Sequence, residues 1–214
     1  MSEPLTFEKV EISLAGQPLI GLDRTIGPGE VLTVMGPSGV GKSSLLSHAA
    51  GFLGPAFQAR GRVLSGNLDV TGLPAHKRQL GLLFQDPLLF PHLSVGANLA
   101  FALTPDLKGS AAREAAVAAA LADVDLSDFA GRDPATLSGG QKARIALMRV
   151  LLSRPRALLL DEPFSKLDAA LRGQIRKLVF DKARAHGLPV LLVTHDHADA
   201  EAAGGSVVDL TLSA

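Results

Sequence analysis

The residues best suited to chemistry lie in a glycine-rich segment, GPSGVGKS, which spans residues 36–43. This segment fits the pattern G-x-x-x-x-G-K-[ST], in which backbone N–H groups surround a phosphate at the start of a helix. Lys42 can place a positive charge on the phosphate oxygens, and the hydroxyl of Ser43 can bind Mg²⁺. The alternative is a strand-to-helix turn without a ligand. The apolar run VLTVM before the segment and the helical run SSLLSHAAG after it favour a phosphate loop.

Two adjacent carboxylates follow another apolar run in the segment ALLLDEP. Asp161 ends the run and can hold Mg²⁺ through a water molecule, while Glu162 can accept a proton from an attacking water. An acidic pair that only ends a strand is the alternative, which the phosphate loop elsewhere in the chain makes less favoured. The pair indicates transfer of a phosphoryl group to water.

Two more polar side chains follow apolar runs: His195 comes directly after VLLVT, and Gln85 comes after GLLF. Ligands of parallel sheets bind at the carboxyl ends of the strands, which makes both residues candidates for the same site. His195 and His197 are alternatively a metal pair, although no third ligand is evident. A loop glutamine without a ligand is the alternative for Gln85. The other histidines are interpreted as structural or surface residues: His48, His76, His92 and His186.

A second glycine-rich stretch, LSGGQ, spans Leu137 to Gln141 and precedes a helical pattern. Ser138, Gly139 and Gly140 would begin this helix, and the N-terminus of a helix attracts anions. Paired glycines also allow another group to approach the backbone closely. A glycine-rich cap in front of a core helix is the alternative, but it leaves both glycines unexplained.

The elements that position these residues indicate an α/β protein. The apolar runs VLTVM, ALLLD and VLLVT are typical of strands covered on both faces, and helical patterns flank them, which predicts a mostly parallel sheet. We expect antiparallel strands in residues 1 to about 30 and 60 to about 72, with a hairpin turn at residues 65–67. Between Leu99 and Pro134 the pattern is helical, with Ser110 as a candidate N-cap.

Composition narrows the classes of function. The chain has 214 residues, a formal net charge of zero, 47% hydrophobic and 20% charged residues, and no cysteine. These values indicate a globular protein, and the lack of basic charge argues against nucleic acid as a partner. Thiolate chemistry and disulfides are excluded. We expect neither a signal peptide nor a membrane-spanning helix, so any membrane role would be peripheral.

In their order along the chain, the motifs resemble those of ATP-binding cassette (ABC) ATPases over nearly the whole sequence. The resemblance implies that ATP and Mg²⁺ bind here. It identifies GPSGVGKS as Walker A, Gln85 as the glutamine loop, LSGGQ as the signature, ALLLDEP as Walker B, SKLD as the aspartate loop and His195 as the switch histidine. The implied catalytic residues are Glu162, His195, Gln85 and Lys42, and the implied metal ligands are Ser43, Gln85 and Asp161. The implied nucleotide-binding residues are Gly36, Pro37, Ser38, Gly39, Val40, Gly41, Lys42, Ser43, Ser44, Ser138, Gly139, Gly140, Gln141 and Asp168.

The resemblance also implies a fold and an assembly. The expected fold is a P-loop NTPase core with a mostly parallel sheet, an N-terminal antiparallel β subdomain and an inserted α-helical subdomain at about 87–153, all in one domain over 1–214. Two copies would form a homodimer head to tail, so that each signature loop covers the γ-phosphate on the other copy. The stretch FQDPLLFPHLSVGANLAF is similar to importer ATPases, which implies a membrane permease that contacts Phe90, His92 and Leu93. A solute-binding protein and a place on the cytoplasmic face of the inner (plasma) membrane are expected as well.

Two positions depart from the family pattern. Lys166 stands where the family has a small residue, which is expected to alter contacts across the dimer. The adenine-stacking aromatic residue of the family is expected near Ser13 and Leu14, where the sequence has none, and Phe7 is an alternative. Two other functions stay open: a soluble ABC ATPase that acts on nucleic acid or the ribosome, and a small-molecule kinase with a Walker A loop. RNA- or DNA-stimulated hydrolysis would favour the first, and phosphate transfer to an acceptor would favour the second.

Overall fold

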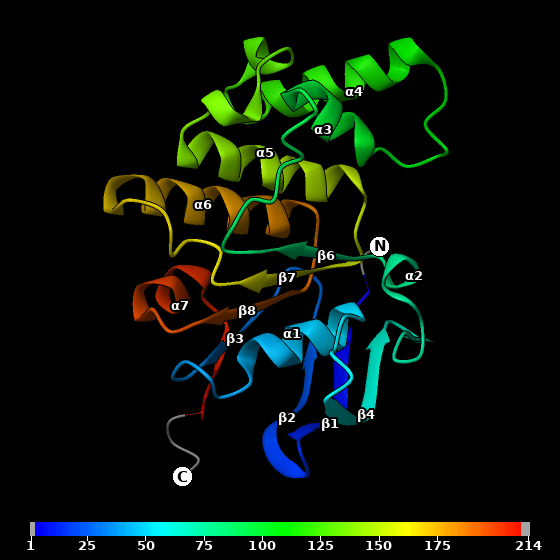
Figure 1. Ribbon diagram of the computed structural model, residues 1–214, viewed down its shortest axis with the longest axis vertical. Helices are drawn as coiled ribbons and strands as arrows, with labels where there is room; N and C mark the ends of the chain where they lie inside the picture. Colours follow the sequence, from blue (N-terminus) through cyan, green and yellow to red (C-terminus); the bar gives the residue numbers. More distant parts are fainter. Residues whose placement is uncertain (1–2, 211–214) are drawn as a thin grey trace. The chain divides into compact units, whose positions relative to one another are not determined.

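The computed structural model describes residues 3–210, apart from the side chain of Ala170. The chain forms two compact units, whose elements are labelled in Figure 1. Unit 1 contains the described part of residues 1–82, 156–162 and 176–214, and unit 2 contains residues 83–155 and 163–175. Unit 2 therefore also includes residues 163–175, which lie outside the helical subdomain predicted at about 87–153. The assignment of all 214 residues to one domain stays a prediction.

Unit 1 begins with an antiparallel sheet in the strand order β2-β1-β4-β5, as the sequence predicts. Its strands are β1 (Leu5–Leu14), β2 (Gln17–Ile26), β4 (Phe57–Ser65) and β5 (Leu68–Asp69). Ser65 pairs with Leu68, so Gly66 and Asn67 form the turn of the predicted hairpin. Gly66 has a φ of 60°, a conformation that glycine adopts without steric cost.

The second sheet has the strand order β6-β7-β8-β3-β9, in which β7, β8, β3 and β9 are parallel. Its strands are β3 (Val31–Met35), β6 (Leu80–Leu83), β7 (Ala157–Asp161), β8 (Val190–Thr194) and β9 (Ser206–Asp209). Every residue of β3 and β8 is buried, which explains why both sequences are apolar except for Thr33 and Thr194. The predicted parallel sheet is confirmed. The carboxyl ends of β3 and β8 lead directly into the phosphate loop and His195, and β7 ends at Asp161.

Helix α1 (Lys42–Ala50) contributes to one apolar core with both sheets of unit 1 (Figure 1). Leu45, Leu46 and Ala49 of this helix are fully buried in that core. The helix ends at Gly51, whose φ of 84° makes a left-handed cap. Arg78, the last residue of α2 (Ala75–Arg78), donates hydrogen bonds to the carbonyls of His48 and Ala49. These bonds fix the end of the helix that starts at the phosphate loop.

Unit 2 is helical, as predicted, and in it α3 (Val95–Phe101), α4 (Ser110–Ala122) and α5 (Gly139–Leu152) pack against one another. Two short 3₁₀ helices, η1 (Ser127–Phe129) and η2 (Pro134–Thr136), connect α4 to α5. The predicted N-cap of α4 was wrong by one position, because Gly109 occupies it with a φ of 90° and Ser110 is already helical. The Ser110 hydroxyl instead donates to Glu114 Oε1 at 2.6 Å.

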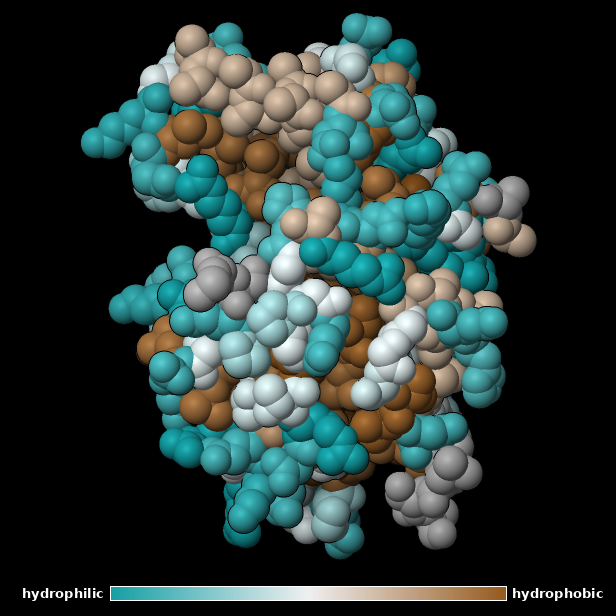
Figure 2. All heavy atoms as spheres, turned by 180° about the vertical axis from the view of Figure 1, so that it is seen from behind, coloured by the Kyte–Doolittle hydropathy of each residue, from teal (hydrophilic) through white to brown (hydrophobic). Residues whose placement is uncertain are grey.

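The alanine run of α4 is divided between the core and the surface of unit 2. Val117, Ala120 and Leu121 are buried, whereas the outward alanines form a pale brown band in Figure 2. Among the described residues, no helix is both long enough and apolar enough to cross a membrane. Residues 3–210 contain two further helices: α6 (Ala169–Ala185), which runs from unit 2 into unit 1, and α7 (His197–Ala203) of unit 1.

Candidate functional site

The phosphate loop of unit 1, residues 36–43, leads from β3 into α1 and includes the first two residues of that helix, Lys42 and Ser43. Gly39 and Gly41 have φ values of 85° and 98°, which side-chain-bearing residues rarely adopt. A Cβ on Gly41 would also lie 2.7 Å from Leu19 Cγ, so this position requires glycine for two reasons. The helical hydrogen bonds of α1 begin with the Leu45 N–H, which donates to the Gly41 carbonyl at 3.0 Å. The N–H groups of the preceding residues are thus available to an anion, because they precede the first helical partner.

Lys42 lies within this loop and is only 5% exposed. Its Nζ donates to the carbonyls of Gly36 at 2.6 Å and Pro37 at 2.8 Å. These two bonds hold the ammonium group against the loop backbone. An anion bound by the loop N–H groups would meet this positive charge, as the sequence predicts.

Ser43 and Asp161, which are far apart in the sequence, are in contact in unit 1. The Ser43 hydroxyl donates to Asp161 Oδ1 at 3.1 Å. Burial raises the pKa of the Asp161 carboxyl, and the adjacent Glu162 raises it further, while the Ser43 hydrogen bond and Lys42 act in the opposite direction. The surroundings of Asp161 therefore disfavour its ionised form, which a bound cation would stabilise. A hydroxyl and a carboxylate oxygen at one place are a donor set that fits Mg²⁺.

Glu162 and His195 form a hydrogen-bonded pair that the sequence did not predict. The distance from His195 Nδ1 to Glu162 Oε1 is 3.0 Å. Their positions share a cause, since each residue directly follows one of the paired strands β7 and β8. Glu162 has a φ of 45°, an uncommon conformation for a residue with a side chain, and its N–H donates to the Val193 carbonyl at 3.0 Å. Backbone strain of this kind is typical of functional sites.

The alternative metal pair of His195 and His197 gains no support from the structure. Within residues 3–210, no three or more His, Cys, Asp or Glu side chains gather in a way that could hold a metal ion. Of the other histidines, His48 is buried, whereas His76, His92 and His186 are exposed. His195 is the histidine whose ring is hydrogen-bonded to a carboxylate of the site, that of Glu162.

The signature residues begin α5 in unit 2. Ser138 is the N-cap, because its Oγ accepts from the Gln141 N–H at 3.3 Å while the Ser138 N–H donates to Gln141 Oε1 at 2.9 Å. A Cβ on Gly140 would lie 2.2 Å from Leu171 Cδ2, so packing inside unit 2 explains this glycine. The cap alone left both glycines unexplained, and packing now accounts for Gly140. Gly139 is exposed, and a Cβ there would meet only Leu167, at an ordinary 3.8 Å.

The remaining predicted residues of unit 2 have separate local roles. Gln85 is exposed and lies two residues after the end of β6. Asp168 caps α6, since its Oδ1 accepts from the Leu171 N–H at 2.9 Å. Lys166 forms an ion pair with Asp86, with 2.7 Å between Nζ and Oδ2. Unit 1 thus contains the predicted residues 36–44 of the phosphate loop and the contacting side chains of Asp161, Glu162 and His195. The other predicted residues belong to unit 2: Gln85, Ser138, Gly139, Gly140, Gln141 and Asp168.

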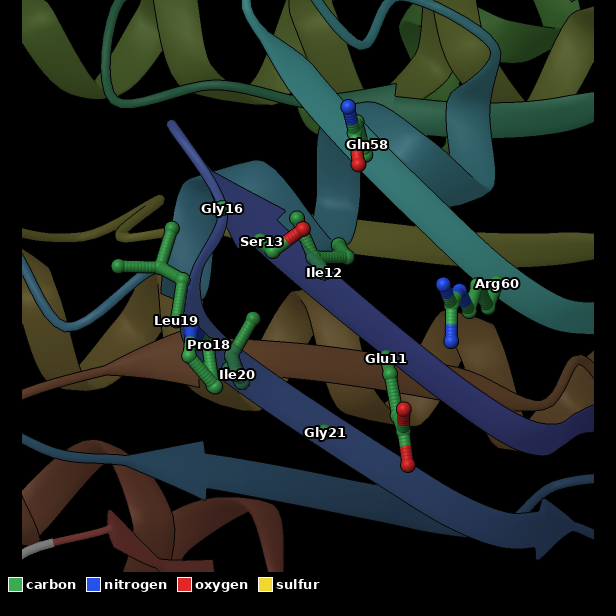
Figure 3. Close-up of a pocket in the computed structure, with 10 residues that line it drawn as sticks. All are labelled: Glu11, Ile12, Ser13, Gly16, Pro18, Leu19, Ile20, Gly21, Gln58 and Arg60. Atoms are coloured by element: carbon green, nitrogen blue, oxygen red, sulfur yellow. The ribbon is translucent and has the colours of Figure 1, made fainter.

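A pocket of about 530 Å³ lies on the antiparallel sheet of unit 1 (Figure 3). Its walls include the apolar side chains of Pro18 and Leu19, and Ser13 lies beside them. Leu19 also packs against Gly41, so the pocket adjoins the phosphate loop. The described residues that line it are Glu11, Ile12, Ser13, Gly16, Pro18, Leu19, Ile20, Gly21, Gln58 and Arg60, none of which is aromatic.

Two residues considered from the sequence as adenine contacts are absent from this lining. Leu14 is 38% exposed but does not belong to the pocket. Phe7 is fully buried in the core of unit 1, so the alternative that it covers a base was wrong. Ser13 does line the pocket.

Comparison with known protein families matches residues 19–165 to the ABC transporter family. The chain belongs to this family. Membership confirms the predicted family and the ATP-hydrolysing activity that it implies. The motifs on which the resemblance rested lie within the matched residues, except for the end of the aspartate loop and His195.

Individual relatives agree with this assignment. This ABC protein is 49% identical over 192 residues to an uncharacterized ABC transporter ATP-binding protein, YnjD, of Escherichia coli K12, covering 90% of the chain and 88% of the relative. It is 47% identical to PhnT of Salmonella choleraesuis, a putative 2-aminoethylphosphonate import ATP-binding protein, over 84% of the chain. The chain spans about half of PhnT, 48% of its length.

A solved structure confirms the fold. CbiO1 of Clostridium perfringens, described as part of the ABC transporter complex cbiONQ, superimposes with a TM-score of 0.83 at 28% identity. The match covers 98% of this chain and 85% of cbiO1. The α/β architecture with one antiparallel and one mostly parallel sheet is therefore that of an ABC ATPase.

Proposed function

We propose that this ABC protein forms a homodimer that binds ATP and Mg²⁺, hydrolyses the ATP and drives a membrane permease that imports a solute. The observation that carries the proposal is the arrangement of five residues in unit 1, where Lys42 lies in the phosphate loop, Ser43 contacts Asp161, and Glu162 contacts His195. Each of these residues has a separate part in moving a phosphoryl group to water. The direction of transport is supported by the similarity to PhnT, a putative 2-aminoethylphosphonate import ATP-binding protein.

The phosphates of ATP would bind to the loop of residues 36–44. Backbone N–H groups at the start of α1 point toward bound oxygens, and the helix dipole adds about half a positive charge. Lys42 supplies a full charge, which its bonds to the carbonyls of Gly36 and Pro37 already place in the loop. Gly39 and Gly41 have positive φ values, which glycine adopts without steric cost, so the loop carries no backbone strain at these two positions.

Ser43 and Asp161 of unit 1 would hold Mg²⁺, while Gln85, which belongs to unit 2, stays a predicted ligand. A bound Mg²⁺ ion neutralises negative charge on the phosphate oxygens. Asp161 is suited to this role because burial and its neighbour Glu162 raise its pKa, so an added positive charge stabilises its ionised form. Ser43 would exchange its hydrogen bond to Asp161 for a shared position on the ion.

Glu162 would act as the general base. Its Oε1 receives the hydrogen bond from His195 when Nδ1 carries the proton, and the carboxylate would accept a proton from water. The same tautomer leaves His195 Nε2 as an acceptor, and protonation of that nitrogen would give a donor for a phosphate oxygen. His195 therefore orients the base and can also contact the substrate.

The signature residues would complete the site of the other copy in the dimer. Gly139 is exposed at the start of α5, and packing does not require its lack of a side chain. Close approach of a γ-phosphate to the backbone does require it. Ser138 and Gln141 fix the first turn through reciprocal hydrogen bonds, so the turn is rigid before a ligand arrives. Asp168 caps α6 and is proposed as a contact between copies.

The base of the nucleotide would lie in the pocket of unit 1. That pocket adjoins the phosphate loop through the contact between Leu19 and Gly41. Pro18 and Leu19 offer aliphatic surface, so the base would gain apolar contact but no aromatic stacking. The phosphates would then supply a larger share of the affinity, and ATP would be only modestly preferred over GTP.

The permease would bind an apolar surface of unit 2 that contains Leu88, Phe90 and Phe101. Leu88 and Phe101 are 56% and 69% exposed. The Phe90 ring lies 4.9 Å from that of Phe101 between centroids, and the Phe90 N–H donates to buried Asn98 at 2.8 Å. This anchoring makes the surface rigid. The neighbouring His92 and Leu93 are proposed as further permease contacts, the cytoplasmic face of the inner membrane as the location, and a solute-binding protein as a third component.

The test is purification of the tagged chain from membranes of its own cells, followed by an assay of ATP hydrolysis. We expect integral membrane proteins to co-purify with the wild type and to be lost from Phe101→Glu, while Phe52→Glu, at an equally exposed phenylalanine of unit 1, retains them. Hydrolysis that requires RNA or DNA, without a membrane partner, would contradict the proposal and favour a soluble ABC ATPase.

A further inference from the structure

The backbone on both sides of His195 is tied to one hydroxyl group. The N–H of Asp196, which follows His195, donates to Thr194 Oγ1 at 3.0 Å. Thr194 ends β8 and is 1% exposed, and its hydroxyl donates in turn to Asp199 Oδ2 at 3.1 Å. The hydroxyl thus joins the residue before His195, the residue after it and a side chain of α7.

A buried ion pair holds the other end of this arrangement. Asp199 is 2% exposed, and its Oδ1 accepts a hydrogen bond from the Arg176 guanidinium of α6. Arg176 Nη2 also donates to Asp196 Oδ2 at 3.2 Å. The second oxygen of Asp196 accepts from the Ala198 N–H at 2.8 Å and so caps α7. Every one of these bonds ends on the segment of residues 194–199.

Stability alone does not account for this choice of residues. A buried ion pair can often be replaced by apolar side chains of similar volume with no loss of stability, because desolvation offsets most of the attraction. What the charged groups add is direction, since a guanidinium binds two carboxylates in a fixed geometry. The two carboxylates are those that follow His195 in the chain, Asp196 and Asp199.

We propose that Thr194, Asp199 and Arg176 are positioning residues that hold His195 where its Nδ1 meets Glu162. The His195 side chain is 57% exposed, so little packing restrains the ring itself. Its position therefore depends on the backbone that these residues fix. The inference rests on the proposed function, in which Glu162 is the general base. Loss of the network would move the imidazole, and a displacement of about 1 Å at a catalytic group can cost ~10²-fold in rate.

The first test compares two substitutions of one residue. Thr194→Val has nearly the shape of threonine but loses both hydrogen bonds, whereas Thr194→Ser retains the hydroxyl. We expect Thr194→Val to lower single-turnover ATP hydrolysis about 10- to 100-fold with an unchanged ATP dissociation constant, and Thr194→Ser to restore most of the rate. Arg176→Met should resemble Thr194→Val.

A matched control separates positioning from general destabilisation. Val179 lies on the same helix as Arg176 and is 2% exposed, and no hydrogen bond joins its side chain to residues 194–199. Val179→Ala should lower the melting temperature through a cavity but leave the rate per folded molecule unchanged. If Arg176→Met does not fold, the comparison of Thr194→Val with Thr194→Ser still tests the inference.

Nuclear magnetic resonance supplies a readout that does not depend on activity. In ¹⁵N-labelled protein, the ring nitrogens of His195, assigned by comparison with His195→Gln, should report a protonated Nδ1 in the wild type and in Thr194→Ser. Thr194→Val should shift these signals toward a mixture of tautomers. A wild-type rate in Thr194→Val, an equal loss of rate in Val179→Ala, or unchanged His195 signals would overturn the inference. A wild type that hydrolyses no ATP would contradict the proposed function instead, and the spectra would still test the network.

Discussion

Glu162→Gln separates the role of general base from all other roles of this residue. Glutamine has the shape of glutamate, and its Oε1 can still accept the hydrogen bond that joins Glu162 to His195 Nδ1 at 3.0 Å. The backbone bond from the Glu162 N–H to the Val193 carbonyl does not depend on the side chain. The substitution should therefore leave the fold and the phosphate loop intact, and remove only the ability to take a proton from water.

The expected magnitude follows from that single loss. Removal of a general base costs 10²–10⁴-fold in rate, which corresponds to about 3–5 kcal/mol in the barrier. The phosphate contacts of Lys42 and the loop do not involve Glu162, so the ATP dissociation constant should change by less than about twofold. With ATP bound but not hydrolysed, the dimer should accumulate.

The assay combines single-turnover hydrolysis with size-exclusion chromatography in the presence of ATP and Mg²⁺. Glu162→Gln should elute as a dimer and hydrolyse ATP at least about 100-fold more slowly than the wild type. Glu201→Gln makes the same chemical change at an exposed position of α7 and should behave as the wild type. Normal hydrolysis by Glu162→Gln, or a variant that stays monomeric with ATP, would refute the reasoning.

Three further predictions concern packing, the base pocket and pH. Gly140→Ala should lower the free energy of unfolding by about 1–2 kcal/mol in urea denaturation. A Cβ 2.2 Å from Leu171 Cδ2 would overpack unit 2, and the cost of overpacking exceeds the stability that alanine adds through its higher helix propensity. An unchanged denaturation midpoint would contradict the packing role. Ser13→Tyr should strengthen the binding of ATP and GTP alike by up to about tenfold, ~1.4 kcal/mol, because it adds an aromatic ring that can stack on the base in the pocket. Leu14→Tyr should leave both affinities unchanged in the same titrations, because Leu14 does not line the pocket. Stronger binding in Leu14→Tyr alone would show that the base binds elsewhere. Burial, and then the charge of Arg78, lower the pKa of His48. The neutral form of His48 therefore stabilises the fold above the unfolded-state pKa of about 6.5, and this contribution is lost as the pH falls toward the folded-state pKa. Between pH 7.5 and pH 5.5, the free energy of unfolding should fall less in His48→Leu than in the wild type. An equal fall in both proteins would contradict the prediction.

The sequence predicted those parts of the site that depend on local patterns. A glycine at position 41 followed by Lys42 and Ser43 indicates a phosphate loop because the backbone, the charge and the hydroxyl are all within one short segment. Asp161 and His195 follow buried apolar runs, and the carboxyl ends of parallel strands meet at one edge. The contact between Glu162 and His195 needed one more fact, namely that β7 and β8 are neighbours in the sheet.

Other features depend on residues that are distant in the sequence. Gly140 is required by Leu171, which belongs to the following helix, so the LSGGQ pattern alone assigned it only a ligand role. Ser110 was predicted as the N-cap of α4 because serine is a common N-cap residue. In the structure the N-cap is Gly109, which has a positive φ. The bonds from Arg176 to Asp196 and Asp199 join α6 to α7, and neither the spacing nor the residue types indicate them.

A mixture of two inactive variants tests the central claim, that each ATP site is built from two copies of this chain. Lys42→Ala damages the phosphate loop, and Gly139→Asp places a carboxylate where the γ-phosphate of the other copy would bind. In a mixed dimer one site carries both changes and the other carries neither. If the sites form between copies, equal mixing of the two variants should restore up to about a quarter of wild-type ATP hydrolysis, since half of the dimers are mixed and each has one intact site. A mixture as inactive as the separate variants, with hydrolysis by the wild type under the same conditions, would contradict the account.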